Sequence, residues 1–414
     1  MTSWIALVGW LVCLGAAWLL SSNKRLFPWR TVAAGCGLQL VIAWIILRTP
    51  VGERFFARLD WAFQRLLKFA DEGTSMVFGP LASPSLLSET WGPQNGFLFA
   101  VGVTGTIVLV ASLSSLLYHY GILQVAVRAM AWVMRRLMNV SGSESLAAAA
   151  NIFMGQTEAP MVVKPYLATM TRSELLSLMT GGMATIAGGM LAAYVMLGVP
   201  AGHLLTASVI SAPAAILMAK IVLPEEETST TESSTAGSPE IETINGLDAL
   251  CRGASDGMKL AINVMAMIIA FVAVVALANA LLSGALAWFG AEEPKPLQAV
   301  LGWIHAPLVW LMGVPWKDCE LIGTLLGERV VLNEFIGYLG LTQARDQLDE
   351  RSFTIATYAL CGFANFASIA IQIGGISAIA PSRREDLARL GLRSMIAGLL
   401  ACYSTACVAS LLIP

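Results

Sequence analysis

The chain has 414 residues, of which 57% are hydrophobic and 13% are charged, and its formal net charge at pH 7 is −2. Its mean hydropathy is +0.71, and because soluble proteins carry about 25% charged residues, this composition excludes an ordinary soluble protein. The small net charge, without a basic tract, excludes a nucleic-acid polymer as the partner. The sequence has no GxxxxGK[ST] phosphate-binding loop, so any uphill work would have to draw on an ion gradient.

Eight apolar stretches are predicted to cross the membrane, because a helix needs about 20 mostly apolar residues to span a hydrocarbon core of about 30 Å. They are residues 4–21, 33–48, 97–118, 173–197, 202–222, 260–287, 353–379 and 394–413. Arginine and lysine are concentrated in the loops that this layout places inside, as the positive-inside rule requires. The layout places both termini outside.

Two amphipathic segments are predicted to lie in the membrane interface. Residues 48–68 carry basic side chains at helical spacing among phenylalanines and leucines, which is typical of an interfacial helix. Residues 123–137 are a second candidate, on the inner side. Residues 224–242 are rich in Glu, Ser and Thr and nearly lack apolar side chains, so we expect 223–248 to be a disordered cytoplasmic linker between two halves.

A polar hairpin is predicted over residues 146–164, LAAAANIFMGQTEAPMVVK. Each apolar arm reaches only about 15 Å at 1.5 Å per residue, which is about half of the hydrocarbon core. The segment should therefore enter the membrane, turn near the midplane and leave on the same side, where its tip is buried in protein or lines a cavity. A carboxylate at that depth costs at least about 3 kcal/mol, so Glu158 is a candidate functional residue.

The second half repeats this arrangement. Residues 321–341 form a second predicted hairpin, with Asn333 and Glu334 at its polar tip, and an interrupted, glycine-containing span follows each hairpin, at 180–190 and at 361–368. This duplication is typical of an inverted-repeat transporter, in which broken helices meet near the midplane and hold substrate and ion. The structural alternative is that the glycines only allow close packing of helices.

These motifs resemble those of concentrative nucleoside transporters. The resemblance extends from about Phe97 to the C-terminus and is carried by GQTEAP with Lys164, Pro165 and Tyr166, by ATIAGG, by Asn333, Glu334 and Phe335, and by ALCGFANFASIAIQIGG. It implies an all-α polytopic protein of a bacterial inner membrane, forming a homotrimer in which each protomer has a scaffold domain and a transport domain that moves like an elevator. Residues 1–120 and 249–290 would be mainly scaffold, and residues 121–222 and 318–414 the two halves of the transport domain.

The resemblance also implies the residues that bind a nucleoside. The expected nucleobase contacts are Gln156, Thr157, Glu158 and Met190, and the expected ribose contacts are Glu334, Asn365 and Ser368, with Phe363 beside the sugar. The residue types suit these roles, because a carboxylate accepts hydroxyl protons and an amide both donates and accepts.

Sodium is the expected coupling ion, at positions Asn151, Met154, Thr185 and Ile186 by the same resemblance. An amide, a hydroxyl and main-chain carbonyls supply the oxygen ligands that such an ion takes. In the structural alternative, Asn151 only caps a hairpin helix. Proton coupling through Glu158 or Glu334 is a second possibility for the same fold. An intramembrane enzyme with the two glutamates as acid and base is disfavoured, because the sequence has no nucleophile–base constellation and no metal-ligand motif.

Overall fold

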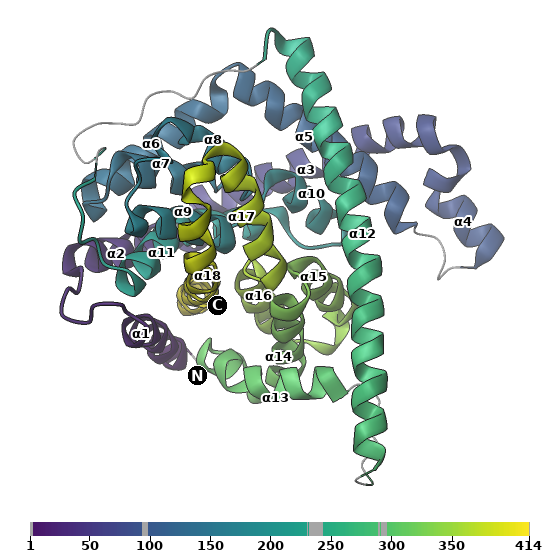
Figure 1. Cartoon of the computed structure of the whole chain (residues 1–414). Helices are drawn as coiled ribbons and strands as arrows, with labels where there is room; N and C mark the ends of the chain where they lie inside the picture. Colours follow the sequence, from purple (N-terminus) through teal and green to yellow (C-terminus); the bar gives the residue numbers. More distant parts are fainter. Residues whose placement is uncertain are drawn as a thin grey trace.

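A computed structural model describes residues 3–92, 98–229, 231, 243–288, 290 and 296–413. Across these residues every regular element is a helix (Figure 1), and the prediction of an all-α polytopic protein is confirmed. Six helical stretches in the described ranges are long and apolar enough to cross a membrane, and shorter apolar helices accompany them.

The first third of the chain forms six α-helices. They are α1 (Ser3–Leu19), α2 (Trp29–Arg48), α3 (Pro50–Phe78), α4 (Pro84–Trp91), α5 (Phe99–His119) and α6 (Ile122–Met138), with the 3-10 helix η1 (Gly79–Ala82) before α4. The two predicted amphipathic segments are helices, although α3 continues ten residues beyond position 68. Thr49 starts α3 by accepting a hydrogen bond from the main-chain N–H of Gly52, and Pro50 occupies the first turn, where its missing N–H costs nothing.

The first hairpin and the two spans after it follow. They consist of α7 (Gly142–Ala150), α8 (Ala159–Val162), η3 (Lys164–Tyr166), α9 (Arg172–Ala184), α10 (Gly188–Met196) and α11 (Ala201–Val222). Both α7 and α9 begin with a capping box, in which Ser141 pairs with Glu144 and Thr171 pairs with Glu174. The predicted span 173–197 is a pair of helices, because the chain leaves the helical conformation between α9 and α10.

The second half begins with the longest helix, α12 (Gly246–Ala287), which extends along one side of the molecule in Figure 1 and packs on α5. It is followed by α13 (Pro296–Leu311), α14 (Trp316–Val331), α15 (Glu334–Gln343), η4 (Arg345–Gln347), α16 (Glu350–Leu360), α17 (Phe366–Ile379), η5 (Pro381–Arg383) and α18 (Arg384–Leu412). The pair α14–α15 forms the second hairpin, and α16 and α17 are the two parts of the predicted span 353–379.

Three features of the second half differ from the sequence prediction. The helix α18 begins at Arg384, ten residues before the predicted start at 394. The helix α12 begins well before position 260, since Asn245 caps it by accepting from the main-chain N–H of Asp248. The helix α13 was not predicted, because its 16 residues are too few for a straight span and it contains Pro307. It packs against α14, α1 and α12.

The expected linker also differs from the prediction at both of its ends. Residues 246–248 belong to α12, and residues 223–229 and 231 are held against α7, α9 and α11 by hydrogen bonds described below. Positions 230 and 232–242, where the composition most strongly predicts disorder, lie outside the described residues.

The packed centre of the molecule consists of α9 and α11 together with the C-terminal part of α18. Most of α9 and α11 is buried, and α18 contacts both of them as well as α1, α16 and α17. By contrast, the apolar surface of α12 is largely exposed, with Ile269 at 72% and Leu281 at 67%. Hairpin 1, α10, α16 and α17 pack against this centre, and hairpin 2 packs against α16.

Candidate functional site

The tip of hairpin 1 is a turn between α7 and α8. It is closed locally, because the main-chain N–H of Gly155 donates to a carboxylate oxygen of Glu158 at 3.2 Å. Thr157 and Glu158 are exposed, whereas Gln156 is buried at 9% exposure. The tip therefore exposes a carboxylate and a hydroxyl, while the Gln156 amide is largely buried.

The tip of hairpin 2 presents Glu334 as the first residue of α15. Asn333 caps this helix by accepting from the main-chain N–H of Ile336 at 3.0 Å. The Glu334 side chain is 4% exposed, and each of its oxygens accepts one hydrogen bond, from the Tyr194 hydroxyl at 2.9 Å and from Nδ2 of Asn365 at 3.1 Å. Each oxygen retains capacity to accept from a ligand hydroxyl.

The break between α16 and α17 places Asn365 and Ser368 beside that carboxylate. Asn365 caps α17, because its Oδ1 accepts from the main-chain N–H of Ser368 at 2.8 Å. This bond fixes the orientation of the amide, so Nδ2 must point to Glu334. Gly362 in the break has φ +146°, and a Cβ there would lie 2.7 Å from the Cys402 sulfur and from the carbonyl oxygen of Met183, so only glycine fits.

A buried arginine satisfies the carbonyls that this break exposes. Arg329 of α14 is 0% exposed; its guanidinium donates to the carbonyl of Ala359 at 3.1 Å, to that of Gly362 at 3.2 Å and to the sulfur of Cys402 at 3.1 Å. Unpaired carbonyls at a helix end need such donors when water is absent. Arg329 therefore holds the broken helix against hairpin 2.

A hydrogen bond between Gln156 and Ser368 joins the two hairpin tips through α17. Nε2 of Gln156 donates to the Ser368 hydroxyl at 3.1 Å, so Gln156, Ser368, Asn365 and Glu334 form a connected chain of polar groups. Thr157 lies against α17, since a Cβ on Gly375 would be 3.2 Å from its methyl carbon.

The other two predicted substrate residues, Met190 and Phe363, are buried at 3% and 9% exposure. Met190 lies in α10 and Phe363 in the break between α16 and α17. Neither makes a polar contact that would link it to the chain of hydrogen bonds, so their place beside a base or a sugar remains a prediction.

Two of the predicted sodium ligands, Thr185 and Ile186, lie in the break between α9 and α10, and the other two, Asn151 and Met154, lie in hairpin 1 just after α7. The Thr185 hydroxyl donates to the carbonyl of Gly181 at 2.9 Å, and a Cβ on Gly181 would lie 2.9 Å from Nδ2 of Asn151. Asn151 and Thr185 thus approach the same residue of α9. Gly181 is required here because a Cβ would collide with the Asn151 amide, so the close packing at this glycine is packing against a polar side chain.

The segments that contain Met154 and Ile186 run alongside each other. The main-chain N–H of Gly188 donates to the carbonyl of Phe153 at 3.2 Å, and a Cβ on Gly155 would lie 3.3 Å from that of Ala187. Main-chain carbonyls of an unwound segment are typical ligands for a transported cation.

The donor set fits a sodium ion at one decisive point. Asn151 is 1% exposed, and neither its Oδ1 nor its Nδ2 has a hydrogen-bond partner among the described residues. An unpaired buried amide is costly and calls for an explanation, and a cation on Oδ1 supplies one. Asn151 is the C-cap residue of α7 through its main-chain N–H, but its side chain makes no capping hydrogen bond among the described residues.

Two polar residues of the site were missed in the sequence. Tyr194 binds Glu334, and Gln372 donates to Oε1 of Gln156 at 3.2 Å. Both lie one helical turn beyond a predicted residue, Tyr194 four positions after Met190 and Gln372 four positions after Ser368. That spacing on one helix face was the available signal.

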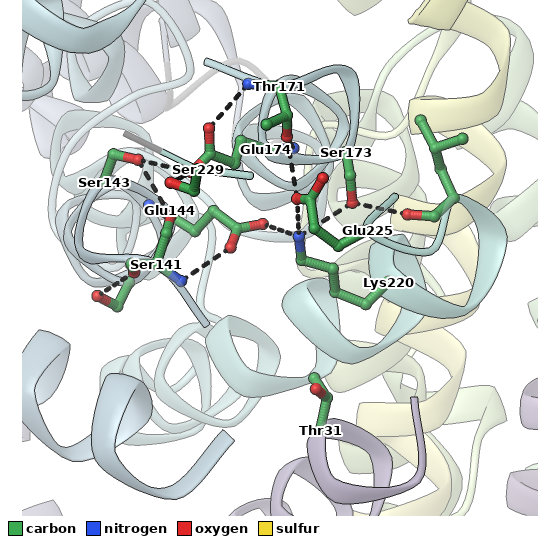
Figure 2. Close-up of polar contacts among 12 residues, drawn as sticks. Thr31, Ser141, Ser143, Glu144, Thr171, Ser173, Glu174, Lys220, Glu225 and Ser229 are labelled. Carbon is green, nitrogen blue, oxygen red and sulfur yellow. Dashed lines mark hydrogen bonds and ion pairs between the residues drawn. The ribbon is translucent and has the colours of Figure 1, made fainter. Parts of the chain in front are cut away.

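A second polar cluster, also missed, lies at the base of hairpin 1 (Figure 2). Lys220, near the end of α11, is 5% exposed and pairs with Glu144 at 2.6 Å and with Glu225 at 2.9 Å. Its ammonium group also donates to the Ser173 hydroxyl at 2.9 Å. These contacts tie α7, α9 and α11 to the start of the linker.

The linker residues extend this cluster. Ser229 donates to the carboxylate of Glu174, and the hydroxyls of Ser143 and Thr231 lie 2.8 Å apart. A cavity of about 740 Å³ adjoins the cluster and is lined by Lys220 and by side chains of α2, α6 and the linker. It contains none of the predicted substrate or sodium residues, so we treat the cluster as a structural element separate from the site.

Comparisons with known proteins match the chain over nearly its whole length. Family models described as "Na+ dependent nucleoside transporter" match residues 8–81 with their N-terminal part and residues 203–410 with their C-terminal part, and a "Nucleoside recognition" model matches residues 100–201. An uncharacterised transporter of Haemophilus influenzae is 42% identical, over 99% of this chain and 97% of its own length. The nucleoside permease NupC of Helicobacter pylori is 36% identical, over 100% and 98%.

Solved structures give the same result. The structure of CNTnw in an inward-facing substrate-bound state has a TM-score of 0.93 at 37% identity, covering 100% of this chain and 98% of the other. A CNTnw variant in an outward-facing state also gives 0.93. The fold and the two polar tips therefore define a membrane transporter whose structural relatives adopt alternating-access states, and not an enzyme. The chain belongs to the concentrative nucleoside transporter family.

Proposed function

We propose that the chain is a symporter that imports nucleosides with sodium. The single observation that carries the proposal is the connected chain of hydrogen bonds from Gln156 to Glu334, which unites both hairpins and the second broken helix. Gln156, where these hydrogen bonds begin, is five positions after Asn151, whose buried amide has no partner among the described residues. Substrate and ion would thus bind to one hairpin.

The ribose would bind at Glu334. Its carboxylate is held by two donors, Tyr194 and Asn365, so its oxygens are fixed in direction before a ligand arrives. A fixed carboxylate that accepts from two neighbouring hydroxyls selects a sugar with both of them, and prearranged acceptors reduce the ordering cost of binding. The Ser368 hydroxyl, 2% exposed, would contribute at the same end.

The nucleobase would bind at the tip of hairpin 1. Gln156, Thr157 and Glu158 are consecutive there and combine an amide, a hydroxyl and a carboxylate, which can match both donors and acceptors of a base. Buried Met190 would form part of the apolar wall for the ring.

Sodium would occupy the position between Asn151 and Thr185, with the carbonyls of Met154 and Ile186 completing the ligand set. Because the residue after Met154 begins the substrate tip, an ion there would order the tip for the base. Ion and nucleoside would then raise each other's affinity by the same factor. One positive charge that enters with a neutral nucleoside gains about 2.3 kcal/mol per 100 mV, enough for roughly fifty-fold accumulation.

The movement would be an elevator motion within a homotrimer. The two hairpins with α9–α11 and α16–α18 would form the transport domain, and α1, α2, α5 and α12 would belong mainly to the scaffold, with both termini outside. The exposed apolar surface of α12 supports a neighbouring protomer or lipid at this helix. Mass measurement of the detergent-solubilised protein tests the trimer; a monomer as the sole species would contradict it.

Calorimetry with uridine tests the site itself. Glu334→Gln keeps the size of the side chain but turns one acceptor into a donor that faces Tyr194 and Asn365, so we expect uridine affinity to fall about 100-fold or more. Glu328→Gln, in α14 and outside the site, is the matched control and should bind like the parent. Parent-like affinity of Glu334→Gln would contradict the assignment of the ribose end.

A further inference from the structure

Gln372 of α17 contacts Gln156, one of the predicted base-binding residues. It is 1% exposed, and its Nε2 donates to the main-chain carbonyl of Met179 at 3.0 Å and to Oε1 of Gln156 at 3.2 Å. Gln156 in turn donates from Nε2 to the Ser368 hydroxyl at 3.1 Å. The chain of hydrogen bonds therefore begins at a main-chain carbonyl of α9.

The carbonyl of Met179 fixes which atom donates and which accepts in every hydrogen bond of this series. Met179 O can only accept, so the Gln372 amide must present Nε2 to it, since the reverse orientation would place two oxygens against each other. The second N–H of the same Nε2 points to Gln156, which must therefore accept this hydrogen bond with its Oε1. Nε2 of Gln156 is therefore on the opposite side, where one N–H binds Ser368 and the other has no partner among the described residues.

No other contact of Gln156 can set this direction. A hydroxyl either donates or accepts, so Ser368 would be compatible with both orientations of the Gln156 amide. Because Ser368 accepts in the arrangement imposed by Gln372, its own proton is left to be donated elsewhere. Removal of Gln372 would leave the Gln156 amide able to turn over.

The packing of α9 holds the two amides in register. A Cβ on Gly182 would lie 2.7 Å from Nε2 of Gln372 and 2.9 Å from Cβ of Gln156. The helix backbone therefore covers this pair closely, and the Oε1 of Gln372, buried without a hydrogen-bond partner in the described part of the chain, cannot exchange places with Nε2 without loss of both bonds.

We propose that Gln372 is a positioning residue that sets the polarity of Gln156, so that the site offers an N–H to the ligand and selects a base atom that accepts hydrogen bonds, such as a carbonyl oxygen or an unprotonated ring nitrogen. The inference rests on the proposed nucleoside site and adds to it the chemistry of the ligand atom that meets Gln156. Gln372 itself acts only through its neighbour.

A double-mutant cycle with uridine, measured by calorimetry on the purified full chain, separates this role from a merely structural one. Gln372→Met and Gln156→Ala should each weaken uridine binding by about 5- to 30-fold, as expected for one hydrogen bond at a buried site. The double variant should bind within about two-fold of Gln156→Ala, because Gln372 has nothing left to orient. Ser377→Ala on the same helix, which removes a buried hydroxyl that has no partner among the described residues, is the control and should match the parent.

Thionated bases test the polarity directly. In 2-thiouridine and in 4-thiouridine one carbonyl oxygen is replaced by sulfur, a weaker acceptor, so the parent should bind one of the two at least about five-fold more weakly than uridine, and Gln372→Met should lose that preference. The inference would be overturned if the parent bound all three ligands with equal affinity, or if the losses of the two single variants simply added in the cycle. The proposed function would still stand in that case, provided that the parent binds uridine and Gln156→Ala weakens this binding. A parent that binds neither uridine nor adenosine would overturn the proposed function, and this inference with it.

Discussion

Replacing Gly182 by alanine is expected to weaken nucleoside binding in a protein that still folds. The added Cβ would lie 2.7 Å from Nε2 of Gln372, 2.9 Å from Cβ of Gln156 and 3.2 Å from its Cα. The last of these atoms belongs to the main chain, so rotation of side chains cannot relieve the overlap. The tip of hairpin 1 must therefore move away from α9.

The magnitude follows from two opposing effects on stability and one on binding. Alanine in a helix interior is favoured over glycine by about 0.5–1 kcal/mol, whereas an extra carbon in a packed core costs about 1–3 kcal/mol. The net loss of stability should therefore be at most about 2.5 kcal/mol. Separation of Gln156 from Ser368 and Gln372 should cost about 1–3 kcal/mol of binding energy, which is a fall of about 5- to 150-fold in affinity.

Uridine affinity by calorimetry and thermal unfolding in detergent measure the two quantities separately. Gly37→Ala in α2 is the matched control, because a Cβ at Gly37 meets no atom within 4 Å; it should bind uridine like the parent and be equally or more stable. If Gly182→Ala bound uridine with parent affinity, the tip of hairpin 1 would not depend on its contact with α9, and the geometry argued for Gln156 would be refuted.

Three further predictions concern other parts of the structure. Lys220→Met leaves the buried Glu144 carboxylate without its cation and should lower the free energy of unfolding by about 3–5 kcal/mol with uridine affinity within about two-fold of the parent; unchanged thermal stability would contradict the ion pair. Arg329→Met leaves two carbonyls at the break of α16 and α17 unpaired and should cost about 2–5 kcal/mol of stability, measured by thermal unfolding, together with a loss of uridine binding; a variant that melts and binds like the parent would show that the break is held by other groups. Asn365→Ala should weaken uridine more than 2′-deoxyuridine or 3′-deoxyuridine, because the carboxylate it orients is assigned to the ribose hydroxyls; equal losses by calorimetry would remove that assignment.

The hairpins and broken helices could be predicted because their polar and glycine residues interrupt otherwise apolar sequence. Polar residues such as Glu158 and Glu334 within short apolar arms have no place in an ordinary span, and their repetition in both halves made the pattern specific. Sequence alone offered two interpretations for the glycines of α9. Both interpretations apply in the structure. Gly181 and Gly182 allow close packing, and the side chains that pack against them are the polar residues Asn151, Gln156 and Gln372.

The partners of these residues could not be predicted, because they depend on contacts between distant segments. Tyr194 and Gln372 lie in helices whose sequence is almost wholly apolar, so the only local signal was their four-residue spacing from Met190 and Ser368, which does not identify a partner. Lys220 lies inside the predicted span 202–222, and its burial between Glu144 and Glu225 depends on contacts with other segments that the sequence does not show. The composition of the linker indicated disorder and could not show that Ser229 and Thr231 bind buried side chains at the base of hairpin 1.

Uptake of radiolabelled uridine into proteoliposomes, with a sodium or a proton gradient imposed in turn at constant ionic strength, tests the central claim most directly. We predict that an inward sodium gradient drives accumulation, that an inside-negative potential accelerates it, and that Asn151→Ala and Thr185→Ala abolish the dependence on sodium. Accumulation driven by an inward proton gradient and indifferent to sodium would contradict sodium coupling and would make Glu158 and Glu334 the coupling groups.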